Sequence, residues 1–487
     1  MSAKESKERV WTSGVDPEHS SSESWQLDSS NAGPTSYVLF SCASATIITF
    51  EFGWNVGVPN NSEKILRYCE NNGTGTLPDC LPMGDLLWGF ATGVFAIGGL
   101  VGSFFAGPIA DKVGRKQALF WNNLFLIVGG LFLAFSVNTP MFIIGRFIVG
   151  IGCGVGSTVT PMYNNEVSPV RIRGAMGALV QVFMCLGIMV SQALGLVLSI
   201  VPSWRILYGL TIVPAVLQMV LLLFCPETPR YLLAEDRGEQ AKSTLAKLRS
   251  GYNVEKEFDM MKSNVSEFHS QHKEASLHNR IHDILRDPFI RRMLVISCVV
   301  HAAQQLCGIN GVNFYSTTIL TETAGADVAS KITVAISAFN TFVNAAVSLL
   351  VDRLGRKPLF IVSSSCMCLF SVLLVIALNL SIDGLTIASV VCFAGSFGLG
   401  LGTVPFMIVP ELVPTWSSGV VVSCATTVNW ICNFIIGFIF PSLISGLQNY
   451  TFVIFAALNL VFTTFGILFV PETRGKSIAD LAKSNKR

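Results

Sequence analysis

Amide side chains occur within some of the most apolar stretches of this sequence. The segment QQLCGIN places Gln304, Gln305 and Asn310 in a largely apolar run. An amide both donates and accepts hydrogen bonds without carrying charge, so it suits a solute with many hydroxyl groups, such as a sugar. Amides are costly in hydrocarbon unless they face a cavity or a partner. Hydrogen bonding between helices is the alternative use of any single one of them.

Further candidates of the same kind lie in other apolar runs. An aromatic face packs against the apolar C–H groups of a sugar ring, so aromatic residues near such amides are also candidates for sugar binding. The additional candidate binding residues are Gln181, Asn340, Phe406, Asn429, Trp430 and Asn433. Gly308 and Gly311, within and just after QQLCGIN, predict a locally broken helix that exposes backbone polar groups.

The composition indicates which elements must position these residues. Of 487 residues, 51% are hydrophobic and 13% are charged, against about 25% charged in ordinary soluble domains. The apolar runs are each near the roughly 20 residues that a helix needs to cross a bilayer. Hydrocarbon cannot satisfy an unpaired backbone group, so we predict an all-α membrane protein. Its twelve predicted spans are 36–59, 85–110, 118–137, 141–164, 175–200, 204–225, 292–320, 329–351, 358–380, 384–410, 418–445 and 450–471.

A polar central segment divides these spans into six plus six. It contains GEQAKSTLAKLRS, which is typical of a helix. The net charge of +2 gives no reason to expect a nucleic-acid partner. The predicted organisation is a cytoplasmic tail (1–35), a first half (36–225), a helical linker (226–291), a second half (292–471) and a second cytoplasmic tail (472–487).

Lys and Arg residues predict the orientation. They gather in the links after the second, fourth and eighth spans and in the linker, which places these segments and both termini in the cytoplasm. The link 60–84 then lies on the opposite side, where oxidation is permitted, and we predict a disulfide between Cys69 and Cys80. Asn72 begins a glycosylation sequon, and Asn60 is a weaker candidate close to the membrane.

Charged motifs recur at equivalent places in the two halves. GPIADKVGRKQALF (107–120) is echoed by VDRLGRKPLF (351–360), NNEVSP by VPELVP, and CPETPR by VPETRGKS. Orientation signals explain the basic residues but not the repeated acidic ones, so we infer an internal parallel repeat. We predict a conformational lock in which a network of these charges pairs across the halves and separates on opening. Its members are Asp111, Arg115, Glu166, Arg173, Glu227, Arg230, Asp352, Arg356, Glu411 and Glu472.

Together with QQLCGIN, these motifs resemble the sugar porter branch of the major facilitator superfamily, which includes the facilitative glucose transporters. The resemblance covers about residues 36–480. It implies alternating access around one midplane site for a hexose such as D-glucose. By this resemblance Trp430 lines the cavity, Tyr315 is an exofacial gate, and sugar-hydroxyl ligands are Gln181, Gln304, Gln305, Asn310 and Asn340.

The sequence departs from the family at several positions. Phe406 stands where many members have Trp, and Gly398 where many have an acidic residue. Ser418 stands where the repeat predicts an Arg, so the lock of the second half is incomplete.

The first span bears on proton coupling. FEFGWNVGVPN has Asn55 where proton-coupled sugar porters typically have Asp. An amide does not titrate, so facilitated diffusion is favoured. Glu51 lies four residues earlier on the same helical face and leaves proton symport open as an alternative.

Other functions remain as alternatives. A carrier of polyols, inositol or pentoses would have the same fold. A sugar receptor is disfavoured by the tail of about sixteen residues after Pro471, and an enzyme by the lack of a catalytic dyad or metal cluster. GIGCGVG lacks the Lys of a phosphate-binding loop, so no nucleotide is expected. We expect no cofactor, a sugar and the bilayer as partners, and a monomer. The expected location is the plasma membrane, with the membrane of the vacuole or another organelle as the alternative.

Overall fold

The computed structural model describes residues 33–68, 77–250, 252–272, 277–474, 476, 478 and 480–481. Most of the two predicted tails, Cys69 and the sequon residue Asn72 therefore lie outside the described residues, as does the side chain of Asp352. Every regular element of the described part is a helix.

Two groups of helices form the body of the molecule. The first group consists of α3 (Ser36–Arg67), α4 (Asp85–Val113), α5 (Arg115–Ala134), α6 (Thr139–Val167), α7 (Arg173–Leu198), α8 (Trp204–Gly209) and α9 (Ile212–Phe224). The second group consists of α14 (Pro288–Leu306), α15 (Ile309–Ala324), α16 (Ala326–Leu354), α17 (Arg356–Asn379), α18 (Asp383–Gly398), α19 (Val404–Leu412), α20 (Thr415–Leu447) and α21 (Thr451–Leu468).

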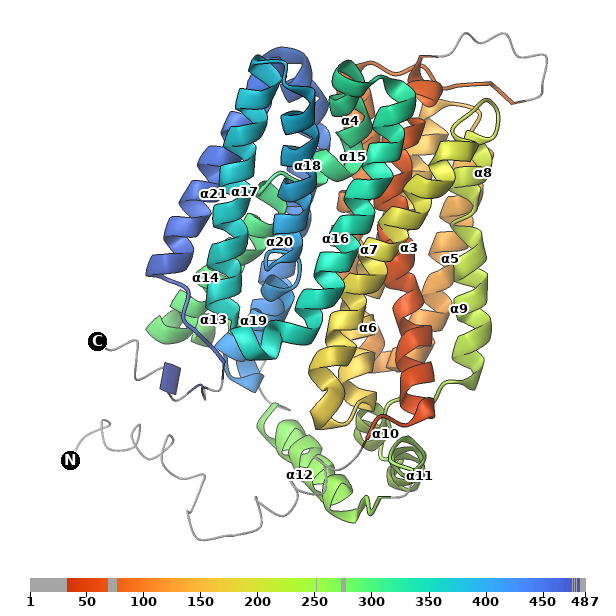
Figure 1. Ribbon diagram of the computed structural model, residues 1–487. Helices are drawn as coiled ribbons and strands as arrows, with labels where there is room; N and C mark the ends of the chain where they lie inside the picture. The colour runs from red at the N-terminus through yellow and green to blue at the C-terminus, as the bar shows by residue number, and fades with distance from the viewer. Residues whose placement is uncertain are drawn as a thin grey trace.

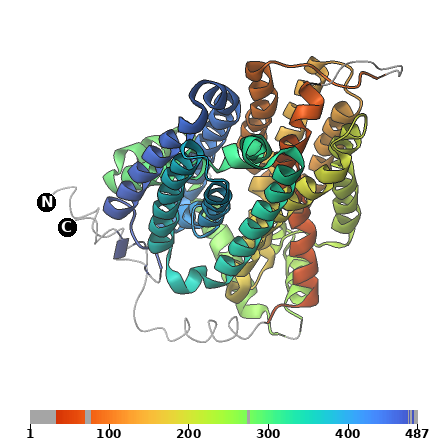
Figure 2. The same ribbon diagram turned by 45° about the horizontal axis from the view of Figure 1, so that its top comes forward.

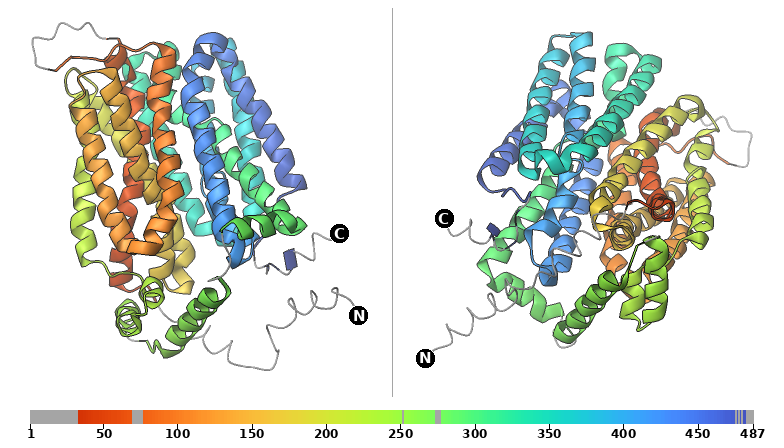
Figure 3. Two further views of the ribbon diagram at one scale, coloured as in Figure 1. Left: turned by 180° about the vertical axis from the view of Figure 1, so that it is seen from behind. Right: turned by 60° about the horizontal axis from the view of Figure 1, so that its bottom comes forward.

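The two groups stand side by side, red to yellow against green to blue (Figures 1 and 2). Between them in the chain come α10 (Pro229–Ala234), α11 (Gly238–Leu248), α12 (Glu255–His272) and α13 (Leu277–Arg286). Helices α10, α11 and α12 lie beyond one end of the bundle (Figure 3), which we name the linker end. Thr35, at the start of α3, donates from Oγ1 to the carbonyl of Leu248 (3.1 Å), so α3 begins at this end and finishes at the opposite, far end.

The prediction of twelve spans in two halves is confirmed. Nine segments of the described chain are long and apolar enough to cross a bilayer, and one of them, Ser417–Leu468, includes both α20 and α21. Helix α16 and the pair α18–α19 complete the set of twelve. The helix predicted in the linker is also present as α11.

The predicted break in the seventh span is confirmed, at Gly308. This residue has φ +100°, and a Cβ there would lie 2.7 Å from the ring of Phe455, so both its backbone and its surroundings require glycine. Gly311 lies inside α15 and is not part of the break. A second interruption, at residues 399–403 between α18 and α19, was not predicted, because 384–410 was treated as one span.

Candidate functional site

Five amides come together in one hydrogen-bonded network within the second half. Asn429 Nδ2 donates to Gln304 Oε1 (2.7 Å), and Gln305 Nε2 donates to Asn429 Oδ1 (2.9 Å). Asn310 and Asn433 both donate to Gln305 Oε1. None of the five is more than 9% exposed. The break at Gly308 allows α14, α15 and α20 to bring these amides together without any charged group in the network.

The unpredicted break between α18 and α19 supplies partners for this network. Gln304 Nε2 donates to the carbonyl oxygens of Leu401 (3.0 Å) and Gly402 (2.9 Å). In a continuous helix these carbonyl oxygens would accept hydrogen bonds from backbone N–H groups of the helix itself. The interruption leaves them available to Gln304. The signal was the glycine-rich run GLGLGT at 398–403, which the twelve-span interpretation passed over.

Gln181 brings the first half to the same place. It is buried on α7, and its Nε2 lies 3.5 Å from the position that a Cβ would occupy at Gly402. Asn340, on α16, accepts a hydrogen bond at Oδ1 from Asn344 Nδ2 (2.8 Å). The structure thus brings Gln181 and Gln304 to Gly402 together with Asn344, which the sequence interpretation missed and which links to Asn340.

The two aromatic candidates have different surroundings. Trp430 is 3% exposed and packs against the first half, with its ring stacked on Phe52 (centroids 5.3 Å apart) and edge-on to Phe95 (6.2 Å). Phe406 is 46% exposed and lies edge-on to His301, with 5.0 Å between centroids. Trp430 therefore joins the halves in this structure, while Phe406 is the more accessible ring.

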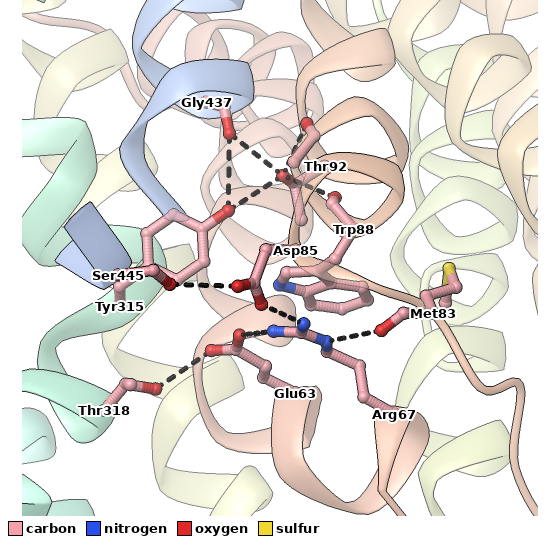
Figure 4. Close-up of polar contacts among 11 residues, drawn as sticks. Glu63, Arg67, Met83, Asp85, Trp88, Thr92, Tyr315, Thr318, Gly437 and Ser445 are labelled. Carbon is pink, nitrogen blue, oxygen red and sulfur yellow. Dashed lines mark hydrogen bonds and ion pairs between the residues drawn. The ribbon is translucent and has the colours of Figure 1, made fainter. Parts of the chain in front are cut away.

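At the far end, an ion-pair cluster that the sequence did not reveal joins the two halves (Figure 4). Arg67 binds Glu63 (2.6 Å) and Asp85 (2.5 Å), which belong to α3 and α4. Both carboxylates also accept hydrogen bonds from the second half, Glu63 from Thr318 and Asp85 from Ser445, at 2.9 Å each. Arg67 thereby holds two carboxylates of the first half, each of which accepts a hydrogen bond from the second half.

Tyr315 lies beside this cluster and also spans the halves (Figure 4). Its hydroxyl is 3.0 Å from Thr92 Oγ1 of α4 and donates to the Gly437 carbonyl of α20 (3.3 Å). Its ring stacks on Phe440 with 5.2 Å between centroids. These contacts fit the predicted role of a gate at this end.

Asn60 also joins the two halves at this end, which corrects its interpretation as a glycosylation site. Its side chain is 2% exposed, and Nδ2 donates to the Asn313 carbonyl (2.6 Å) and to Ser316 Oγ (2.9 Å). A buried amide with these partners leaves no room for a glycan. Of the predicted disulfide, the structure describes Cys80, which is disulfide-bonded, while the pairing with Cys69 stays a prediction.

At the linker end the repeated motifs of the first half form a compact cluster. Arg115 binds Glu166 (3.1 Å) and Asp111 (2.9 Å). Glu227 accepts hydrogen bonds from the backbone N–H groups of Arg115 and Lys116, at 3.1 Å each. Burial raises the pKa of Glu227 above its usual value, although these donors act in the opposite direction.

The second half repeats this cluster. Arg356 binds Glu411 (2.9 Å), and Glu472 accepts from the backbone N–H groups of Arg356 and Lys357, at 3.1 Å each. Thr473 donates to Glu411 as Thr228 donates to Glu166. The two threonines were missed although both follow the Pro-Glu pair of the repeated motif.

The lock differs from the prediction in its connections. The ion pairs just described each lie within one half, whereas pairing across the halves was expected. Arg173 and Arg230 make no ion pair within the described part of the chain. The pairs across the halves therefore stay a prediction for another conformation.

Glu51 is a fully buried charged residue of α3. It is 0% exposed, and neither carboxylate oxygen has a hydrogen-bond partner among the described residues. Asn55 Nδ2 donates to the backbone carbonyl of Glu51 rather than to its side chain (2.9 Å). Arg146 is equally buried but donates to the Asn55 carbonyl (2.8 Å).

Comparison with known proteins shows the family to which this chain is similar. The profile of the family described as "Sugar (and other) transporter" matches residues 41–483. Facilitated glucose transporter member 3 of solute carrier family 2 is 35% identical over 464 residues in Mus musculus, covering 92% of this chain and 93% of that protein. The same transporter from Oryctolagus cuniculus is 34% identical over 465 residues, covering 92% of each chain.

Solved structures agree in fold. The proton:xylose symporter XylE bound to 6-bromo-6-deoxy-D-glucose superposes with a TM-score of 0.76 at 22% identity, covering 93% of this chain and 100% of that chain. The inward open XylE of E. coli gives a TM-score of 0.75 at 22% identity, covering 92% and 100%. From the family match and this likeness, the chain belongs to the sugar transporter family and adopts the twelve-helix major facilitator fold.

Proposed function

We propose that this protein is a hexose transporter that moves D-glucose or a related monosaccharide by alternating access, as a uniporter. The observation that carries the proposal is the network of five uncharged amides at the breaks of α14–α15 and α18–α19. Each amide is hydrogen-bonded to another amide and could bond to a sugar hydroxyl instead. A hydroxyl, like an amide, both donates and accepts hydrogen bonds without carrying charge. The glucose-transporting relatives support the choice of substrate.

The contacts also support a conformation. Hydrogen bonds between the halves join residues near the far end, such as Thr92 to Tyr315 and Glu63 to Thr318. The charge clusters at the linker end are each internal to one half. Since Lys and Arg gather at the linker end, we place that end and both termini in the cytoplasm and regard this conformation as inward-facing.

The same orientation supports the remaining assignments. The far end would face the outside, where the disulfide of Cys80 and a glycan at Asn72 are chemically compatible with an extracellular surface. We therefore place the protein in the plasma membrane. The amide network of the second half and Gln181 of the first half belong to one chain, so one monomer in the bilayer suffices for a site. The proposed mechanism includes no nucleotide, nucleic acid or cofactor.

Uptake of labelled D-glucose into proteoliposomes tests the proposal. The purified protein is assayed with and without an inward proton gradient. Uptake that stops at equal concentrations under both conditions supports a uniporter. Absence of glucose uptake together with uptake of a polyol, inositol or pentose would replace the substrate with one of those solutes.

Proton-coupled sugar symport is the second candidate, and Glu51 is the observation that favours it. A carboxylate that is fully buried without a hydrogen-bond partner among the described residues is stabilised by binding a proton. Under this alternative the gradient drives accumulation above equilibrium, and Glu51→Gln abolishes accumulation while leaving downhill exchange. Equal behaviour of Glu51→Gln and the wild type would make Glu51 structural.

A further inference from the structure

Asn344 is a fully buried residue of α16 with one unused hydrogen-bonding atom. Its Nδ2 donates to the carbonyl oxygen (2.9 Å) and to Oδ1 (2.8 Å) of Asn340. Its Oδ1 has no partner among the described residues. An unsatisfied buried acceptor is unfavourable, so the position of this oxygen calls for an explanation.

Two glycines provide the space that this side chain occupies. A Cβ at Gly398 would lie 2.9 Å from Asn344 Nδ2, and a Cβ at Gly402 would lie 2.9 Å from Asn344 Oδ1. Neither glycine has a positive φ, so the backbone conformation does not require glycine at these positions. The requirement is steric: any side chain at Gly398 or Gly402 would displace Asn344.

The unpaired oxygen also lies at the boundary between the two halves. Gln181 Nε2, from α7 of the first half, is 3.5 Å from the same Cβ position at Gly402. The carbonyl of Gly402 in turn accepts from Gln304 Nε2 (2.9 Å). Asn344 Oδ1 is therefore grouped with two candidate ligands, one from each half, at a place that relative movement of the halves would open.

We propose that Asn344 Oδ1 accepts a hydrogen bond from one hydroxyl group of the transported sugar, in the space that Gly398 and Gly402 leave free. This inference rests on the proposed function and adds a specificity residue to its site. The bond forms when the halves move and a sugar hydroxyl takes the place now next to Gly402. The hydroxyl donates this hydrogen bond to Asn344 Oδ1. The hydrogen bonds from Asn344 Nδ2 to Asn340 keep the amide of Asn344 oriented.

Competition by deoxy analogues of D-glucose, each lacking one hydroxyl, tests the proposal in proteoliposomes. In the wild type the analogue without the recognised hydroxyl binds more weakly, by roughly three- to tenfold for one hydrogen bond. In Asn344→Ala that difference disappears for one analogue only, while the other analogues keep their penalties. Asn340→Ala should relieve a different position, which separates direct binding by Asn344 from an effect through Asn340.

Glycine variants test whether the space beside Asn344 is needed. Gly398→Ala should remove the penalty of the same analogue as Asn344→Ala, and combining the two variants should cause no further change for that analogue. Gly177→Ala, on α7, is the matched control because a Cβ there meets nothing within 4 Å, and its analogue profile should equal that of the wild type. If Asn344→Ala yields little folded protein, Gly398→Ala carries the test, since it keeps the asparagine and displaces it. The same Cβ would lie 3.1 Å from Asn340 Oδ1, so the analogue affected by Asn340→Ala is compared separately.

The outcomes distinguish the role of Asn344 from the proposed transport function. Equal weakening of all analogues in Asn344→Ala, or additive losses in the double variant, would overturn the role of Asn344 while glucose transport by the wild type still supports the proposed function. A wild-type protein that transports no glucose would overturn the proposed function, and this inference with it.

Discussion

The hydroxyl of Tyr315 lies 3.0 Å from Oγ1 of Thr92, and the two residues belong to opposite halves of the molecule. Tyr315→Phe keeps the stacking on Phe440 but removes the hydrogen bonds to Thr92 and Gly437. We expect the far-end-closed state to lose about 1 kcal/mol, the net value of a typical hydrogen bond. Influx and efflux are then measured separately in oriented proteoliposomes.

The populations should shift toward the state that is open at the far end. The KM for sugar presented at the far end should therefore fall, and the KM for sugar presented at the linker end should rise. Thr92→Val is the partner variant and should shift both constants in the same directions. Parallel changes of both KM values would show that Tyr315 acts on the sugar site and not on the gate.

The cluster around Arg67 makes a prediction about stability. The side chains of Arg67 and Glu63 are 4% and 6% exposed, so removing one partner leaves a buried charge. Arg67→Ala should lower the free energy of unfolding by roughly 3 kcal/mol, within the range for a broken buried pair. Thermal unfolding of the detergent-purified protein measures this loss.

A paired variant provides the control. Glu63→Gln in the Arg67→Ala background removes the uncompensated carboxylate, so part of the lost stability should return. Further loss in this double variant would contradict the view that the unpaired charge causes the destabilisation. Lys331→Ala is a surface comparison, since Lys331 and Asp327 are 63% and 82% exposed and their ion pair should matter little.

The repeated clusters at the linker end should act in the same way in both halves. Glu166→Gln and Glu411→Gln each weaken the bond to an arginine that is nearly buried, Arg115 or Arg356. We expect both variants to change the rate of net transport severalfold without changing the order of preference among hexoses. Asp111→Asn should have a smaller effect, because the Asp111 side chain is 65% exposed.

Initial rates and a competition panel of hexoses check this equivalence. A changed order of preference in either Gln variant would place the cluster in substrate recognition. A large effect in one half alone would mean that the two clusters, although alike in geometry, do not have equivalent roles in the transport cycle.

Much of this architecture was predictable because its causes are local in the sequence. Apolar run length predicts the spans, and the repeated motifs predict the equivalent positions of Arg115 and Arg356. Gly308, beside clustered amides, predicts the first helix break. These features depend on residues that are neighbours in the chain or on a repeat that can be read directly.

Other features depend on contacts between distant segments and could not be read in this way. Arg67 meets Asp85 across the 68–84 link, and Asn344 fits only because Gly398 and Gly402 lack side chains. Asn60 satisfies a sequon, yet its partners at Asn313 and Ser316 are more than 250 positions away. A local motif cannot report the burial that such distant partners produce.

The amide network makes the most direct prediction about the sugar site. Gln305→Ala removes the acceptor that Asn310 and Asn433 share, and Gln304→Ala removes the link from Asn429 to the α18–α19 break. Each change should raise the KM for D-glucose by about tenfold or more, because a sugar hydroxyl and the remaining amides both lose a partner. Concentration-dependent uptake in proteoliposomes measures the change, with the amount of inserted protein determined in parallel.

A buried glutamine outside the network is the matched control for these two variants. Gln218, on α9, is 0% exposed and donates to the carbonyls of Ser44 and Ala45 within the first half, at 3.0 Å each. Gln218→Ala should lower thermal stability as any lost buried hydrogen bond does, yet leave the KM unchanged. If all three variants changed the KM alike, the effect would reflect general loosening of the bundle, and the assignment of the sugar site to Gln304 and Gln305 would fail.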